Sequence, residues 1–555
     1  MRTLARDLGA TDLVVVSLAG MVMLLPSLFL VVIARDLLFA LKALAESVVF
    51  VLLLFAVLGS TKPILWFSMI FGLLLPGEIY FIATYGYPSS RHTVSLLTES
   101  SLDETLEFLT GVYHWLFLST LAILLLFGTL LRLTKSNLRL PPAARYCAAA
   151  VLFGLLLGLE VVRAVPWASQ PVRFYSIANA FPVGLAYRIG GYLKYAREGQ
   201  RVAQQLTSYR FDANSSASDL TVVLIIGESA RPDHWALNGY KRDTTPLLSR
   251  QPNLVSFPDM VTPWALTTYS VPILITRKEA SSTDIFPEKS IVAAAAEAGF
   301  HTYWFANQDG LKEVSIHRGE AATRRTYNMA VVREDVDAAL DGDMLPDIDS
   351  AIADGRGKRL ILVHMKGSHW DYHRRYPTEF RQFVPDRGEN GGSVKHDPDL
   401  RERLVNGYDN SIRYTDYFID HVLQTLSKTG QPAVLLYVSD HGQALYDQEC
   451  KLFGHYNDTE INFRTQAMIW FSDSMIERRG SSWMALEANH TRPLTTEGTI
   501  FHTVADALQL NIVDRSSSLL SDTFTPQQRR VNVRAGTIDF DRAKRSGACN
   551  LLSVD

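Results

Sequence analysis

Five long apolar segments in the first 164 residues constrain the fold of this chain more than any other feature. They lie near 12–34, 43–60, 64–86, 114–133 and 145–164. A helix needs about 20 apolar residues to cross the roughly 30 Å hydrocarbon core of a bilayer. The first segment is too long, and too closely followed by others, for a cleaved signal peptide. The sequence therefore predicts a transmembrane domain of five helices over residues 1–164.

The orientation of these helices follows from the Lys and Arg residues of the short loops. Arg2 and Arg6 precede the first span, and the loop between spans four and five is also basic: Arg132, Lys135, Arg139 and Arg145. The loop between spans three and four is acidic: Glu99, Asp103, Glu104 and Glu107. This asymmetry predicts that everything after Ala164 lies on the non-cytoplasmic side. The helices could be a plain anchor or could admit a lipid.

Residues 165–219 read as interfacial helices and a linker. "AFPVGLAYRIGGYLKYAREGQRVAQQL" mixes aromatic residues with Arg and Lys, as suits a membrane–water interface, and a polar stretch follows it. From 220 to 555, helical patterns alternate with apolar runs of strand length, at 221–227, 301–306, 359–365, 432–438 and 467–471. This alternation predicts an α/β domain with a mostly parallel central sheet, covered on both faces.

Composition excludes some classes of protein. The net charge of −3 gives no electrostatic case for binding nucleic acid. Three cysteines cannot make a disulfide framework and lack the spacing of a thiolate metal site. Cys450 and Cys549 both follow the predicted spans and could form one bridge, although nothing in the sequence requires it.

Polar residues stand directly after several of the apolar runs. In a parallel sheet the carboxyl ends of the strands meet at the active-site edge. Glu228 follows the first run, Asn307-Gln308-Asp309 the second, and Asp440-His441 the fourth. Carboxylates and imidazoles are ligands that zinc accepts, so Glu228, Asp440 and His441 are candidate metal ligands. The alternative for Asp440 is a helix cap beside an exposed histidine.

Ser229 is a candidate nucleophile because it follows a predicted strand. A nucleophile elbow requires G-x-S-x-G. Here the run Gly227-Glu228-Ser229-Ala230-Arg231 lacks the second glycine. We therefore interpret Ser229 as the N-cap of the next helix and expect the nucleophile on another loop.

Four motifs in order resemble the membrane-bound phosphoethanolamine transferases of the alkaline phosphatase/sulfatase superfamily. They are "GESARPDHWALNGYKRDTTPLL", "GSHWDYHRRYP", "YDNSIRYTDYFIDHVL" and "SDHG", and the likeness covers about 221–510. Five preceding spans fit the same family. The resemblance implies a sulfatase-like periplasmic catalytic domain over 220–555, anchored in a bacterial inner membrane, with one zinc site and room for a second.

The resemblance also assigns site residues. The zinc ligands of the family are a Glu after the first strand, a nucleophilic Thr and an Asp-His pair, which match Glu228, Thr267, Asp440 and His441. In "VTPWALTTYSVPIL" a shift of one residue would select Thr268 instead of Thr267.

The residues that hold the substrate phosphate are assigned in the same way. His369 stands in a motif similar to "GSHGP", His455 in "LFGHYND", and Lys312 after "WFANQD". The alternative for His369 is a surface histidine near an aromatic cluster, and the matches of His455 and Lys312 are looser.

The resemblance implies transfer of phosphoethanolamine from phosphatidylethanolamine to lipid A or the lipopolysaccharide core, through a phosphoenzyme on Thr267. One departure concerns disulfides. Lipid A-modifying members often carry one around the nucleophile, whereas Pro263 and Ile273 stand at those positions here. This departure favours relatives that modify core sugars or other glycans.

Three other classes of protein share some of these features. A phosphoglycerol transferase of the lipoteichoic-acid type has similar ligands, often with manganese, but "NGYKRDTTP" favours the ethanolamine branch. A true sulfatase needs a C/S-x-P-S/A-R motif, which is absent. A membrane anchor with a degenerate domain would have lost the ligands.

Overall fold

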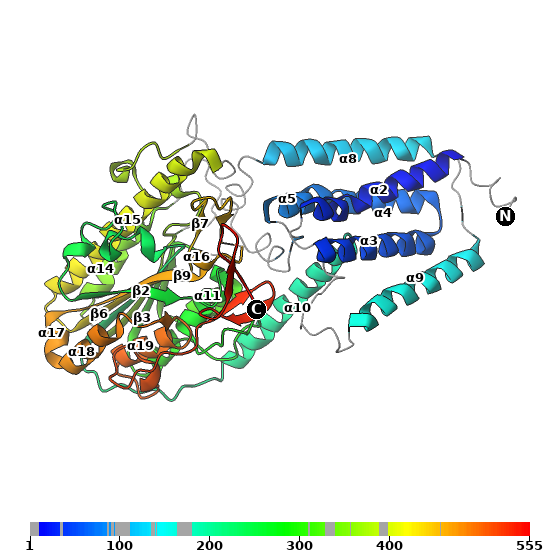
Figure 1. Cartoon of the computed structure of the whole chain (residues 1–555). Coiled ribbons are helices and arrows are strands. Elements are labelled where there is room, and N and C mark those ends of the chain that lie inside the picture. Colours follow the sequence, from blue (N-terminus) through cyan, green and yellow to red (C-terminus); the bar gives the residue numbers. More distant parts are fainter. Residues whose placement is uncertain are drawn as a thin grey trace. The chain divides into compact units, whose positions relative to one another are not determined.

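The computed structural model divides the chain into two compact units, and within the described part the division falls between Ala196 and Arg197 (Figure 1). The structure describes residues 10–33, 37–85, 88–89, 94, 112–134, 139, 141–163, 180–308, 311–327, 339–355, 357–387, 398–455 and 457–554. Arg2, Arg6, Lys135 and the acidic loop used to predict orientation lie outside these ranges.

The first unit is helical. Its helices are Ala10–Ile33 (α2), Leu37–Leu58 (α3), Thr61–Gly72 (α4), Leu75–Tyr85 (α5), Tyr113–Leu133 (α8), Pro142–Arg163 (α9) and the start of Val183–Leu206 (α10). Helices α2, α3 and α8 are long and apolar enough to cross a membrane, and α4 with α5, bent by 45°, counts as a fourth span. In α9 the apolar stretch Pro142–Leu155 is shorter. The described residues therefore contain three or four candidate spans, and the predicted number of five is not confirmed.

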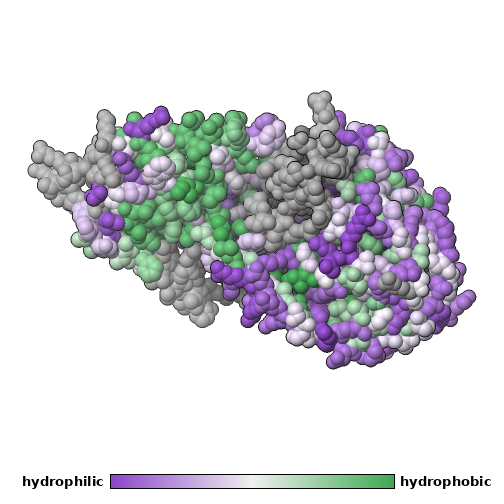
Figure 2. All heavy atoms as spheres, turned by 180° about the vertical axis from the view of Figure 1, so that it is seen from behind, coloured by the Kyte–Doolittle hydropathy of each residue, from purple (hydrophilic) through white to green (hydrophobic). Residues whose placement is uncertain are grey.

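The surface of these helices is apolar. Val32, Phe117 and Leu125 are among many large apolar side chains that are exposed, and Figure 2 shows this surface largely in green. Helices α2, α3 and α4 pack against one another, α8 packs on α4, and α9 on α3. An apolar surface of this extent is unfavourable in water and fits contact with lipid.

The second unit is built on an eight-stranded sheet with the order β10-β2-β9-β6-β1-β5-β3-β4. The strands are Leu220–Gly227 (β1), Leu254–Val261 (β2), His301–Ala306 (β3), Thr323–Thr326 (β4), Lys358–His364 (β5), Ala433–Ser439 (β6), Arg464–Phe471 (β9) and Leu494–Thr495 (β10). Strand β9 runs antiparallel to both of its neighbours, and the other pairs are parallel. The prediction of a mostly parallel sheet is confirmed.

Helices cover both faces of this sheet (Figure 1). Val222, Leu224 and Ile226 of β1 belong to the core on one face, and Val223 and Ile225 to the core on the other. The first core includes residues of Thr267–Ile275 (α11), Ile291–Glu297 (α12), Lys312–Arg318 (α13), Asp473–Arg478 (α17), Gly480–Asn489 (α18) and Thr499–Ala507 (α19). The second includes residues of Leu345–Ala353 (α14) and Arg401–Lys428 (α15). Because a strand alternates its side chains, a strand covered on both faces is apolar throughout.

Short elements complete the second unit. Ala444–Leu445 (β7) pairs with Phe453–Gly454 (β8), and Glu460–Phe463 (α16) precedes β9. Near the C-terminus, Arg530–Val533 (β11) pairs with Gly536–Asp539 (β12), and Lys544–Ser546 (β13) with Leu551–Ser553 (β14). A disulfide joins Cys450 to Cys549, the pairing that the sequence left open.

Candidate metal centre

Two neighbouring strands deliver the acidic residues of the site. Glu228 follows β1, Asp440 follows β6, and Gly227 is the register partner of Ser439, so both carboxylates leave the sheet at the same edge. Glu228, Asp440 and His441 are fully buried, and each offers a ligand atom within 4.8 Å of the others. Burying two carboxylates together is costly unless a cation or donors compensate them.

Thr267 joins this cluster from the start of α11. Its Oγ1 donates to Glu228 Oε2 at 3.0 Å and lies 3.5 Å from His441 Nε2. These contacts belong to Thr267 rather than to the neighbouring Thr268. A hydroxyl therefore lies against the acidic and imidazole groups, as a nucleophile held beside a metal would.

The protonation states show why a cation fits here. His441 Nδ1 lies 2.8 Å from the Gly442 carbonyl oxygen, so this nitrogen carries the proton and Nε2 presents a lone pair. Nε2 is 3.5 Å from Glu228 Oε1 and 3.2 Å from Asp440 Oδ2, and that Asp440 oxygen is buried without a hydrogen-bond partner. Two carboxylates, an imidazole and a hydroxyl form a donor set that Zn²⁺ accepts.

The electrostatics of the two carboxyl groups differ. Burial opposes ionisation of Glu228, but the nearby His441, His369 and His455 hold the pKa of its carboxyl below the usual range. Burial, reinforced by the charge of Glu228, raises the pKa of Asp440 well above its usual value. A bound cation would favour the ionised form of both groups.

Ser229 does not cap a helix, so that interpretation of the sequence was wrong. It adopts a positive φ of 56°, and the first helical turn after it, Pro232–His234, begins after Arg231. Its Oγ donates to Glu228 Oε1 at 2.7 Å, and its N–H donates to Asp440 Oδ1 at 3.0 Å. The Ser229 hydroxyl therefore contacts the adjacent Glu228 carboxylate instead of the N–H groups of a helix N-terminus.

Gln308 is a site residue to which the sequence gave no role. Its Nε2 donates to Glu228 Oε2 at 3.1 Å and to the Met365 carbonyl at 2.7 Å. The signal was present, because Gln308 stands in the polar triplet after the second predicted strand. The neutral amide of Gln308 does not belong to any recognised sequence motif, so only its contacts in the folded chain indicate its role.

Asp341 is a second residue that sequence reasoning missed. Its carboxylate accepts from the N–H groups of Lys366 and Gly367, both at 2.8 Å, and shapes the loop that leads to His369. A Cβ on Gly367 would lie 2.9 Å from the Glu228 nitrogen, and the φ of this glycine is +48°. Only glycine allows the loop to approach Glu228 so closely.

The three predicted phosphate-binding residues are placed differently. The ring centroid of His455 lies 4.4 Å from that of His441, and His455 Nδ1 is 3.0 Å from Gln443 Oε1. His369 acts electrostatically on Glu228, and its Nδ1 lies 2.5 Å from the Trp370 carbonyl oxygen. Lys312 begins α13, with its aliphatic stem near Gly199 of α10. The substrate-binding roles of all three remain predictions.

Noncovalent contacts hold the loops before and after α11, the region in which Pro263 precedes the helix and Ile273 lies within it at the two positions where the sequence comparison expected cysteines. The Asn532 side chain donates to the Pro263 carbonyl at 3.2 Å and to the Ala280 carbonyl at 2.7 Å. Trp264 Nε1 also donates to Ala280, at 2.8 Å. The loops before and after the Thr267 helix are thus tied to one residue of β11.

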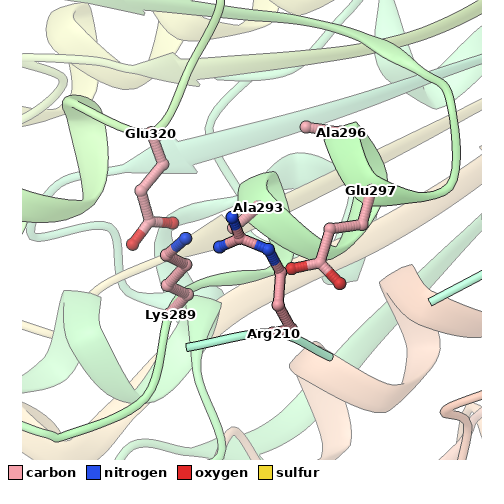
Figure 3. Close-up of a pocket in the computed structure, with 6 residues that line it drawn as sticks. All are labelled: Arg210, Lys289, Ala293, Ala296, Glu297 and Glu320. Atoms are coloured by element: carbon pink, nitrogen blue, oxygen red, sulfur yellow. The ribbon is translucent and has the colours of Figure 1, made fainter. Parts of the chain in front are cut away.

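A cavity of about 360 Å³ lies elsewhere in this unit (Figure 3). Its lining residues are Arg210, Lys289, Ala293, Ala296, Glu297 and Glu320. Both of its carboxylates already accept hydrogen bonds from the protein, Glu297 from Phe211 and Glu320 from Ser290. None of these residues belongs to the Glu228 cluster.

A buried acid–imidazole cluster with a threonine hydroxyl lies at the carboxyl edge of a mostly parallel sheet, and this is a donor set that can hold a metal ion beside a hydroxyl. The family model described as Sulfatase matches residues 221–510, which includes every residue of this cluster. The match covers more than half of the chain, and the chain belongs to the sulfatase family.

Relatives with named activities are similar to this chain in sequence or in fold. The Kdo(2)-lipid A phosphoethanolamine 7''-transferase of Escherichia coli (strain K12) is 31% identical over 48% of this chain and 47% of its own length, so the match spans about half of that relative. The integral membrane lipooligosaccharide phosphoethanolamine transferase A from Neisseria meningitidis has a TM-score of 0.70 at 19% identity, covering 92% of this chain and 97% of that one.

A smaller structure matches the second unit. The C-terminal periplasmic domain of EptC from Escherichia coli, solved in complex with Zn, has a TM-score of 0.52 at 22% identity and covers 60% of this chain and 95% of that domain. At these identities the two solved structures establish the fold of this chain.

Proposed function

We propose that this protein transfers phosphoethanolamine from phosphatidylethanolamine to lipid A or another glycolipid of the cell envelope. The observation that carries the proposal is the cluster of Glu228, Thr267, Asp440 and His441, in a chain 31% identical over half its length to a lipid A phosphoethanolamine transferase. The acceptor could be the lipopolysaccharide core rather than lipid A, because the cysteines expected around the nucleophile are replaced.

The reaction begins with Thr267. Its Oγ attacks the phosphorus of the donor, the Thr267 Oγ–P bond forms, and the bond from phosphorus to the glycerol oxygen breaks. Diacylglycerol leaves with a proton, and phosphoethanolamine stays on Thr267. A phosphate or hydroxyl oxygen of the acceptor then attacks the same phosphorus and restores the threonine.

Other residues of the cluster prepare this step. Zinc held by Glu228, Asp440 and His441 would lower the pKa of the Thr267 hydroxyl and withdraw charge from the phosphoryl group. The cluster would hold one metal ion, and the nearby His455 and His369 would be the side chains to hold a second. In the simpler arrangement these two histidines bind the phosphoryl oxygens and protonate the leaving oxygen, with Lys312 as a further phosphate contact.

The membrane helices supply access to a lipid donor. We assign five spans, with α9 as the fifth, and place residues 220–555 in the periplasm after a bacterial inner membrane. The support is the length and apolar surface of these helices, together with the basic and acidic loops of the sequence. Residues 1–164 then form the transmembrane domain and 165–219 the interfacial connection.

Donor lipids labelled in the headgroup test the proposal. Purified full-length protein in nanodiscs should release diacylglycerol from phosphatidylethanolamine and pass the label to a lipopolysaccharide acceptor. Release of diacylglycerol from phosphatidylglycerol instead would support the phosphoglycerol-transferase alternative. Zinc analysis of the same sample should find at least one ion per chain.

A further inference from the structure

We propose that the C-terminal hairpin, covalently tied by the Cys450–Cys549 disulfide, is a positioning element that fixes His455 for phosphoryl transfer. The hairpin consists of β13 and β14, Lys544–Ser546 and Leu551–Ser553. It lies beyond residue 510, where the match to the sulfatase family ends. The role of His455 in phosphoryl transfer rests on the proposed function. The contacts between the hairpin and the His455 loop do not depend on that function.

The hairpin holds the His455 loop at both of its ends. Cys450, at the start of this loop, is bonded to Cys549. At the other end, the Glu460 N–H donates to the Asn550 carbonyl at 3.1 Å, and the Leu552 N–H donates to the Asp458 carbonyl at 2.9 Å. Since His455 stands five residues after Cys450, both anchors lie within a few residues of the imidazole.

The same loop also pairs with β7 and packs on the segment that carries His369. Phe453 in β8 pairs with Leu445 in β7, and its ring lies edge-on to Trp370 with centroids 5.2 Å apart. Trp370 directly follows His369, the other predicted phosphate-binding histidine. The packing of Phe453 on Trp370 therefore relates the positions of the two histidines.

His455 also lies beside the metal cluster, with its ring centroid 4.4 Å from that of His441. Gln443, two residues after His441, places its Oε1 3.0 Å from His455 Nδ1. His455 is itself partly exposed, so the anchors of the loop contribute to the position of the imidazole. Loss of the hairpin anchors should disturb the imidazole while Glu228, Asp440 and His441, which are held by β1 and β6, keep their places.

This role differs from general stabilisation. A disulfide that joins residues 99 positions apart constrains mainly the unfolded chain, and on that ground alone its loss should lower stability without a specific effect on catalysis. Misplacing a catalytic group by about 1 Å can slow a reaction on the order of 100-fold. If the hairpin positions His455, breaking the disulfide should slow transfer to an extent that depends on whether His455 is present.

The test uses full-length protein in nanodiscs containing phosphatidylethanolamine. Tris(2-carboxyethyl)phosphine reduces the bond to two thiols, and the phosphine takes up oxygen from water as it is oxidised. The variants are Cys450→Ser/Cys549→Ser, His455→Ala and their combination. Gln528→Ala is the matched control, because it removes an exposed contact to Asp539 in the same C-terminal segment, away from His455.

We expect reduction to slow transfer by roughly 10- to 100-fold and to speed amide hydrogen exchange in 450–460 but not in 436–442, with the zinc content unchanged. The double serine variant should be equally slow and insensitive to the phosphine, and Gln528→Ala should behave as wild type. In His455→Ala, reduction should change the remaining rate less than twofold, because both changes remove the same contribution.

Three results would overturn the inference: unchanged exchange in 450–460 after reduction, full sensitivity of His455→Ala to the phosphine, or loss of zinc in parallel with loss of rate. If the oxidised wild type shows no transfer, the proposed function fails instead. The exchange measurement still decides whether the hairpin holds the loop.

Discussion

At the scale of single residues, neighbours in sequence have different tasks in this site. Glu228 faces the cluster as a candidate ligand, whereas Ser229 turns the chain with a positive φ and donates to that same carboxylate. The hydroxyl that faces both Glu228 and His441 comes from another loop, at Thr267. These contacts favour Thr267 over Ser229 as the nucleophile that we propose.

Thr267→Ala should abolish transfer while zinc stays bound, because Glu228, Asp440 and His441 remain. Thr267→Ser should retain part of the activity, since a hydroxyl is still present. Intact-mass and peptide analysis of wild-type protein trapped with donor lipid should find phosphoethanolamine on the peptide that contains Thr267. Phosphoethanolamine on Ser229 would contradict the mechanism.

Two further variants separate the metal from the nucleophile. Asp440→Ala should lose both zinc and transfer, because the metal would lose one of its anionic ligands. Ser229→Ala should keep transfer but lower the free energy of unfolding by about 1.5–3 kcal/mol, the usual worth of a hydrogen bond to a charged group. Full zinc occupancy in Asp440→Ala would show that the metal lies elsewhere.

At the scale of elements, helix α15 both covers the sheet and supports a distant loop. Asp416 on this helix is buried, and its oxygens accept from the N–H groups of Leu247 and Leu248, at 3.1 and 2.9 Å. Burial, with Asp420 adding a like charge, raises the pKa of Asp416 to about 7. The helix thus carries a carboxyl group that titrates near neutral pH.

The sign of the resulting pH dependence follows from proton linkage. Between about pH 4 and pH 7 the folded state keeps a proton on Asp416 that the unfolded chain has lost. The contribution of Asp416 to the free energy of unfolding therefore falls as the pH rises, by up to about 1.4 kcal/mol per pH unit. Asp416→Asn should be less stable than wild type at pH 5, because one N–H loses its acceptor, and this gap should narrow or reverse at pH 8.

Thermal unfolding of the full-length protein at both pH values measures this gap. The pairwise comparison cancels the contributions of other groups that titrate in the same range. A gap that stays constant from pH 5 to pH 8 would show that Asp416 is ionised throughout.

At the scale of the whole molecule, the chain joins a helical unit with an apolar surface to a polar α/β unit (Figure 2). Transfer from a membrane lipid requires the catalytic unit to lie on the side of the membrane where its acceptor lies. The basic and acidic loops of the sequence predict that residues 165–555 lie outside the cytoplasm.

A reporter enzyme that is active only outside the cytoplasm, fused after Asp555, should therefore be active in cells. A reporter that is active only inside the cytoplasm, fused at the same position, should be silent and serves as the control. The reverse pattern would mean an even number of spans before the catalytic unit. It would then contradict the periplasmic placement of transfer.

Sequence alone determined those features that depend on short-range periodicity. Residues close together in the sequence are enough to recognise the five apolar segments, the strand-length runs and the periodic pattern of α15. The structure has strands or helices at each of these places. The polar residues after the strand-length runs, together with the resemblance of short motifs to a known family, likewise pointed to Glu228, Thr267, Asp440 and His441. The number of spans is the exception, because length and hydropathy leave the bent α4–α5 pair and the short apolar stretch of α9 open.

Tertiary structure alone decided the contacts between segments far apart in the chain. Gln308 and Asp341 gain their places from loops that meet only at the sheet edge, and neither lies in a motif with a set spacing. The same holds for the pairing of Cys450 with Cys549 and for the antiparallel direction of β9. Local patterns record which side of an element is buried, whereas the partner of a polar group is set by the folded chain as a whole.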